Sequence, residues 1–104
     1  NMSSRSEIRF NFRQALAQAS ELDGVADRLE RLADKTMEGS MQTLSGAWKG
    51  QNATAFLRKE DTLKKDIRKT ATEIHNVADD IRRIAKRIYD AEMEALRIAT
   101  ERKS

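Results

Sequence analysis

The sequence predicts an all-α fold, an antiparallel helical hairpin with a Trp-x-Gly turn that dimerises into a four-helix bundle. Three observations lead to this prediction. The 104 residues include no proline, so no residue removes a helical backbone donor. Apolar residues recur at helical spacing in both halves of the chain, and three of the four glycines gather between these halves. We expect one domain, residues 1–104, with helices at about 5–43 and 52–101 and a turn at about 44–51.

The first predicted helix has both a start signal and an apolar stripe. Ser4 and Glu7 have the spacing of a capping box, which predicts a start near residue 5. Gly24 inside the helix costs about 1 kcal/mol relative to alanine, and marks either a bend or a close contact. The stripe, with alternating steps of four and three, consists of Ile8, Phe12, Ala15, Ala19, Leu22, Ala26, Leu29, Ala33 and Thr36, and it is widened on one flank by Leu16, Val25, Leu32 and Met37.

The second predicted helix carries three apolar columns, each with a repeat of seven residues that is typical of coiled-coil packing. The first column consists of Phe56, Leu63, Thr70, Val77, Ile84, Ala91 and Ile98. The isoleucine column consists of Ile67, Ile74, Ile81, Ile88 and Ala95. The alanine column consists of Ala71, Ala78, Ala85 and Ala99.

Three apolar columns are more than one neighbouring helix can cover. We expect the alanine column to pack against the first helix, whose own alanines permit close approach. An apolar column left in water would be an exposed patch of the kind that marks an interface. We therefore predict a dimer whose interface is formed by the four isoleucines Ile67, Ile74, Ile81 and Ile88.

The composition leaves little for catalysis. The chain has no cysteine, a single histidine and no glycine-rich phosphate loop, so disulfides and thiolate chemistry are excluded. His75 precedes Asp79 by four residues, a spacing that can hold a metal, but no further ligand is evident. We predict that the protein is not an enzyme and that it has no catalytic residue, no metal site and no cofactor.

The net charge of +3 does not require an acidic partner. The basic segment IRRIAKRI, residues 81–88, has Asp79, Asp80 and Asp90 within helical reach and no interleaved aromatic residue for base stacking. This pattern predicts a solvated helix face and no specific binding of nucleic acid. No apolar run approaches the ~18 residues of a membrane-spanning helix, so we expect no stable membrane insertion. The first ten residues lack the apolar core of a secretory signal.

The segment LSGAWKGQNATAF, residues 44–56, contains the only tryptophan of the chain. Trp48 lies between Gly46 and Gly50, in the predicted turn. Two interpretations stay open. Trp48 covers the end of the hydrophobic core, as buried aromatic surface commonly does, or it stands partly exposed where a partner can bind it.

Trp48-Lys49-Gly50 in a turn midway along such a chain, followed by Ala53 and Phe56, resembles the WXG-hundred family. These are the early-secreted-antigen-like (ESX) proteins of type VII secretion in Gram-positive bacteria and mycobacteria. The resemblance implies a dimer that leaves a cytoplasmic pool through a membrane ATPase machine, without a cleavable signal peptide. Its partners would be a second copy or a related small helical protein, the type VII secretion ATPase, and a larger secreted toxin that it escorts. Trp48, Gly50 and Phe56 would form a recognition motif.

One departure from the family pattern concerns the export signal, a tyrosine followed four residues later by Asp or Glu. In this chain Tyr89 is followed at that position by Met93, with Glu92 and Glu94 on either side. Either the signal is degenerate, or a partner carries an intact one. We predict a non-enzymatic substrate or targeting partner of a type VII secretion system. The alternatives are a cytoplasmic coiled-coil adaptor and a basic helical nucleic-acid-binding protein.

Overall fold

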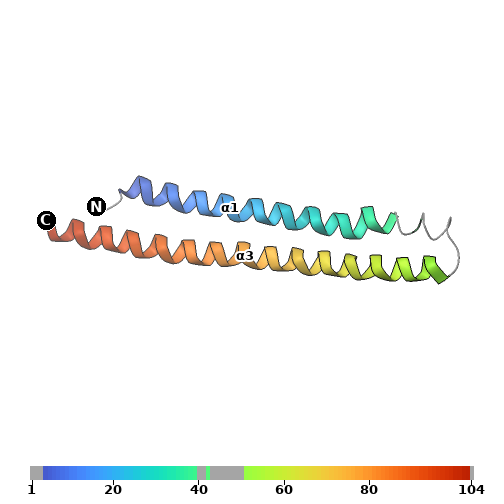
Figure 1. Ribbon diagram of the computed structural model, residues 1–104. Coiled ribbons are helices and arrows are strands. Elements are labelled where there is room, and N and C mark those ends of the chain that lie inside the picture. Colours follow the sequence, from blue (N-terminus) through green and yellow to red (C-terminus); the bar gives the residue numbers. More distant parts are fainter. Residues whose placement is uncertain (1–3, 40–41, 43–50, 104) are drawn as a thin grey trace. The chain divides into compact units, whose positions relative to one another are not determined.

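The computed structural model describes residues 4–39, 42 and 51–103 (Figure 1). Its elements are the α-helix α1, Arg5–Arg31, the π-helix η1, Leu32–Thr36, and the α-helix α3, Gln51–Lys103. Residues 37–39 are again α-helical. The described residues contain two long helices and no strand, which confirms the predicted all-α helical hairpin.

Helix α1 begins where the sequence places its cap. The backbone N–H of Glu7 donates to the Ser4 hydroxyl oxygen at 3.2 Å, and the N–H of Ile8 donates to the Ser4 carbonyl at 3.0 Å. The first N–H groups of a helix have no carbonyl partner inside the helix, so the Ser4 hydroxyl satisfies one otherwise unpaired donor, and the bond from Ile8 is the first i→i−4 bond of α1. Ser4 is therefore the N-cap of α1.

The chain divides into two compact units, each of which pairs part of α1 with part of α3. Unit 1 comprises Asn1–Leu22 and Asn76–Ser104, and unit 2 comprises Asp23–His75. Within unit 2 the two helical segments run antiparallel, because residue numbers rise along one helix as they fall along its neighbour. This order appears in two side-chain pairs, Asp34 with Arg68 and Glu38 with Lys64. The prediction of a single domain over the whole chain stays a prediction.

The core of both units consists almost entirely of alanine. Unit 1 buries Ile8, Ala19, Ala78 and Ala85, and unit 2 buries Ala26, Ala33 and Ala71. The alanines lie seven residues apart on each helix, so each helix presents one narrow line of methyl groups. The first three residues of the predicted alanine column are thus buried. No large side chain of the described residues is fully buried.

The π-helix η1 changes which side chains of the first helical segment are covered. The N–H of Met37 donates to the carbonyl oxygen of Leu32, five residues earlier. A π-helical turn contains about one residue more than an α-helical turn. After it, the position that faces the neighbouring helix is therefore shifted by about one residue toward the C-terminus. Thr36, part of the predicted stripe, is accordingly exposed, whereas Met37 is half-buried.

Gly24 lies within α1, and the space around it does not require glycine. A Cβ atom at this position would meet only the Arg28 side chain, at the ordinary contact distance of 3.5 Å. The expected alternative of a close contact at Gly24 is therefore not supported.

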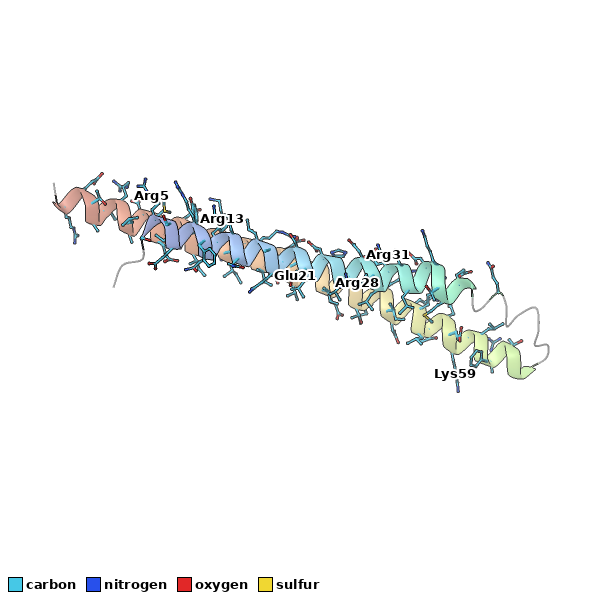
Figure 2. The ribbon with its side chains drawn as sticks, turned by 90° about the horizontal axis from the view of Figure 1, so that it is seen from above. Arg5, Arg13, Glu21, Arg28, Arg31 and Lys59 are labelled. Atoms are coloured by element: carbon cyan, nitrogen blue, oxygen red, sulfur yellow. The ribbon has the colours of Figure 1, made fainter. Side chains whose placement is uncertain are left out.

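Charged side chains project from both helices along their length (Figure 2). The six that Figure 2 labels are all exposed: Arg5, Arg13, Glu21, Arg28, Arg31 and Lys59. Large apolar side chains are exposed as well, several of them on α3, where the dimer interface is predicted.

Candidate functional site

Tyr89, the tyrosine of the predicted export signal, is half-buried in unit 1. Its ring packs against Phe12 of α1, with ring centroids 4.7 Å apart and planes inclined at 33°. Aromatic pairs at this distance contribute about 0.5–1.5 kcal/mol beyond the apolar area they bury. Tyr89 therefore helps to hold α1 against α3 in unit 1.

A shallow hollow of about 210 Å³ adjoins Tyr89. Glu92 lines the hollow, one helical turn after Tyr89, as does Ile88 of the predicted dimer interface. The remaining lining residues are Ile8, Asn11, Phe12, Ala15 and Ala85. Of the two acids that flank Met93, Glu92 is thus the one that shares the surroundings of Tyr89.

Glu94 is bound to its own helix. Arg97 donates from Nε to Glu94 Oε2 at 3.0 Å and from Nη2 to Glu94 Oε1, and from Nη1 to Glu101 Oε1 at 2.6 Å. The hydrogen bonds from Arg97 lower the pKa of Glu94, so this carboxylate stays ionised. The same bonds to Glu94 and Glu101 raise the pKa of Arg97.

The four isoleucines of the predicted dimer interface differ in burial. Ile67 and Ile74 in unit 2 and Ile81 in unit 1 are half-buried, whereas Ile88 is 53% exposed. The first apolar column is more open to solvent. Its large apolar members are all exposed: Phe56 and Leu63 in unit 2, and Val77, Ile84 and Ile98 in unit 1.

The basic segment 81–88 is matched by nearby acids. Its ion pairs along α3 are Arg82 with Asp79 at 3.0 Å, Arg83 with Asp80 at 2.7 Å, and Lys86 with Asp90 at 2.7 Å. Exposed pairs of this kind contribute about 0–1 kcal/mol each. The three acids neutralise much of the positive charge of the segment locally. This favours the predicted solvated face over a surface that binds nucleic acid.

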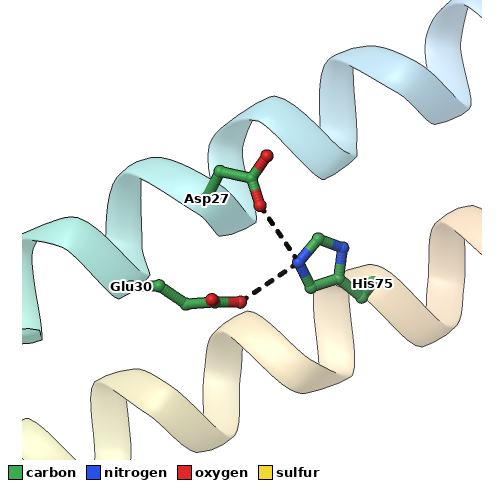
Figure 3. Close-up of side chains that lie close together, drawn as sticks. All are labelled: Asp27, Glu30 and His75. Atoms are coloured by element: carbon green, nitrogen blue, oxygen red, sulfur yellow. Dashed lines mark hydrogen bonds and ion pairs between the residues drawn. The ribbon is translucent and has the colours of Figure 1, made fainter.

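His75 lies among three carboxylates of α1, all within unit 2. Its Nδ1 is 2.6 Å from Asp23 Oδ1. Its Nε2 is 3.1 Å from Glu30 Oε1 and 3.4 Å from Asp27 Oδ1 (Figure 3). Asp79, the companion of His75 that the spacing in the sequence indicated, pairs with Arg82 instead. The missed signal was the spacing of the three acids, which places them on one face of the first helix.

These carboxylates stabilise the protonated imidazole. The hydrogen bond to Asp23 is the largest cause that raises the pKa of His75 above its ordinary value of 6.5, and the hydrogen bond to Glu30 adds to it. Partial burial opposes the shift. With both ring nitrogens protonated, Nδ1–H donates to Asp23 and Nε2–H donates to Glu30.

Asp23→Asn is expected to return the pKa of His75 toward 6.5, because it removes the largest cause of the shift. The measurement is an NMR titration of the imidazole in buffer containing EDTA, with Asp79→Asn as the matched control. Because the folded pKa is raised, the ion pairs of His75 stabilise the fold fully below about pH 6.5. This contribution is lost as the pH rises through the folded pKa. A wild-type His75 that titrates at or below 6.5 would contradict the prediction.

A family model described as proteins of 100 residues with WXG matches residues 7–93. The chain belongs to this family. The match spans most of both long helices and confirms the predicted WXG-hundred resemblance. No significant match was found among curated proteins or among solved structures.

Membership of the WXG-hundred family implies the role of a type VII secretion substrate, and the family consists of secreted, non-enzymatic proteins. Its proteins typically form homodimers and interact with the secretion machinery. Within the part of the chain that the structure describes, no helix has the length and apolar composition needed to cross a bilayer.

Of the predicted WXG-hundred recognition motif, the structure places only Phe56. Phe56 lies near the start of α3 and is 36% exposed. Trp48 and Gly50 lie outside the described residues, so their role as a recognition motif stays a prediction.

Proposed function

We propose that this WXG-hundred protein is exported as a dimer by a type VII secretion ATPase and escorts a larger secreted partner. The family match over residues 7–93 carries the proposal, because it covers the chain on both sides of the Trp-x-Gly segment. Export would begin from a cytoplasmic pool and would not involve cleavage of a signal peptide. No chemical step is assigned to the protein.

The escort role is supported by the surroundings of Tyr89. The family signal requires an acid four residues after the tyrosine, and this chain has Met93 there. Glu94 is engaged by Arg97, and Glu92, which follows Tyr89 by three residues instead of four, lines the hollow beside the Phe12–Tyr89 pair. A chain with this tail would depend on an intact signal supplied by its partner.

The dimer is supported by the apolar surface of α3. In unit 1, Val77, Ile84 and Ile88 are each about half exposed, at 49%, 51% and 53%. A second copy of the chain would remove this surface from water. The proposed interface consists of the isoleucine column together with the exposed neighbours Val77 and Ile84.

Export is tested in a bacterial host with a complete type VII system and in a matched strain that lacks the secretion ATPase. We expect little of the wild-type chain in the culture supernatant when it is expressed alone, and more when a larger partner with an intact signal is co-expressed. Met93→Glu restores the Tyr-x-x-x-acid pattern and is expected to raise export of the chain alone. Met93→Gln, which is polar but uncharged, is the matched control.

Trp48→Ala is expected to abolish partner-assisted export while helicity, measured by circular dichroism, is retained. A cytoplasmic marker reports lysis, and mass spectrometry of the secreted chain checks that its N-terminus is uncleaved. Export that persists without the ATPase would contradict the proposal. Equal export of Met93→Glu and Met93→Gln would contradict the idea that the missing acid at position 93 limits export of the chain alone.

A further inference from the structure

The His75 cluster brings three carboxylates of α1 to the two nitrogens of one imidazole. Asp23 accepts from Nδ1–H at 2.6 Å, and this bond leaves Nε2 as the nitrogen that faces the other carboxylates. Nε2 lies 3.1 Å from Glu30 Oε1 and 3.4 Å from Asp27 Oδ1 (Figure 3). If the imidazole were neutral, Nε2 and the two carboxylate oxygens would face one another with lone pairs and with no proton between them. The arrangement therefore requires a positive centre, which is either a proton or a metal cation.

Two of the distances in the cluster match those between the ligands of a tetrahedral zinc ion. Zinc binds histidine nitrogen and carboxylate oxygen at about 2.0–2.2 Å, so two ligand atoms of one tetrahedral ion lie about 3.3 Å apart. The two distances from Nε2, 3.1 and 3.4 Å, agree with this separation. One ligand atom from each of Asp27, Glu30 and His75 lies within 4.8 Å of the others.

We propose that Asp27, Glu30 and His75 form a binding site for Zn²⁺, with Asp23 as the residue that orients the imidazole. This site revises the expectation from the sequence that the chain has no metal ligands. An imidazole nitrogen with carboxylate oxygens suits zinc, whereas Mg²⁺ and Ca²⁺ bind oxygen ligands. Zinc-ligating histidines commonly donate their second N–H to a carboxylate, which is the role that Asp23 has here.

The site is open to solvent and joins two helical segments of unit 2. The Asp27 side chain is 57% exposed and the Glu30 side chain 44% exposed, so an ion can enter without unfolding the unit. Water would occupy the fourth position of the ion. Because two ligands lie on α1 and one on α3, bound zinc would link the helices and favour the folded unit over the unfolded chain.

Zinc binding is measured on the full-length, untagged protein by competition with a chromogenic zinc chelator. His75 is the only histidine of the chain, so changes in its ring NMR signals report on this site alone. We expect one zinc per chain, a shift of the His75 signals with one equivalent of zinc, and no effect of Mg²⁺. Zinc should also raise the melting temperature of the wild type but not that of His75→Gln.

The variants separate a zinc site from a general effect of charge. His75→Gln and Glu30→Gln are expected to lower zinc affinity at least about tenfold, and Asp23→Asn about tenfold through the orientation of the ring. Asp34→Asn is the matched control, because it also removes an acid of the same helical segment that contacts α3, through Arg68 at 2.7 Å. Its affinity should equal that of the wild type. Zinc binding that is as tight in His75→Gln as in the wild type would overturn the proposal, as would equal competition by Mg²⁺.

Discussion

Ala19→Leu is expected to lower the free energy of unfolding by about 1–3 kcal/mol. Ala19 is fully buried in unit 1, in the line of methyl groups through which α1 contacts α3. A leucine at this position has no space unless the two helical segments move apart. Such a movement would also weaken the neighbouring contacts of Ala78 and Ala85, which are buried in the same unit.

The matched control is Ala17→Leu, two residues away on the same helix. Ala17 is exposed, and leucine and alanine have similar helix propensities, so we expect a change within about 0.5 kcal/mol. Urea unfolding followed by circular dichroism, at one protein concentration for all variants, gives the comparison. If Ala19→Leu proved as stable as Ala17→Leu, the alanine seam would not be the close contact described above.

Ile88→Asp is expected to convert the proposed dimer into monomers without unfolding the chain. Ile88 is 53% exposed in the single chain, so an aspartate there stays hydrated in the monomer. In a dimer that covers α3 the carboxylate would be buried without a partner, which costs several kcal/mol. A cost of about 3 kcal/mol weakens association more than a hundredfold.

Phe10→Asp is the control for the dimer experiment, because Phe10 is also 53% exposed but lies on α1. Light scattering should give twice 11.9 kDa for the wild type and for Phe10→Asp, and 11.9 kDa for Ile88→Asp. A wild-type monomer would contradict the dimer. If only Phe10→Asp dissociated the dimer, the interface would have to lie on α1 and not on α3.

The helices and their buried faces could be predicted because both depend on local spacing. A seven-residue repeat fixes which face of an α-helix is apolar, whatever lies opposite it. Alanines at that spacing on both halves of the chain indicated the seam at which the helices approach. The burial of Ala26 and Ala71 in unit 2, and of Ala19 and Ala78 in unit 1, follows from this pattern.

The companions of His75 could not be predicted because they depend on the register between the helices. A seam of alanines at every seventh position matches its neighbour almost equally well when one helix slides by seven residues. The repeat therefore leaves open which acids of the first helix face His75. The structure selects Asp23, Asp27 and Glu30, in the same unit as the Asp34–Arg68 and Glu38–Lys64 pairs.

The π-turn at Leu32–Thr36 escaped prediction for a related reason. Nothing in LADKT breaks an α-helix, since the segment has neither proline nor glycine. The turn appears where Ala33 is buried and where Glu38, a few residues later, pairs with Lys64. Contacts between residues that are far apart in the sequence therefore decide which side chains are covered after Ala33.

A core of methyl groups also affects how the stability of the fold varies with temperature. Alanine loses no rotamer entropy on burial, so the seam forms without immobilising long side chains. It also removes little apolar surface from water, and the heat capacity of unfolding depends chiefly on that surface. A single chain of this kind would have a small heat capacity change and a flat stability curve, with a broad melting transition. Association through the isoleucines would sharpen that transition, because it adds the larger apolar area that the alanine seam lacks.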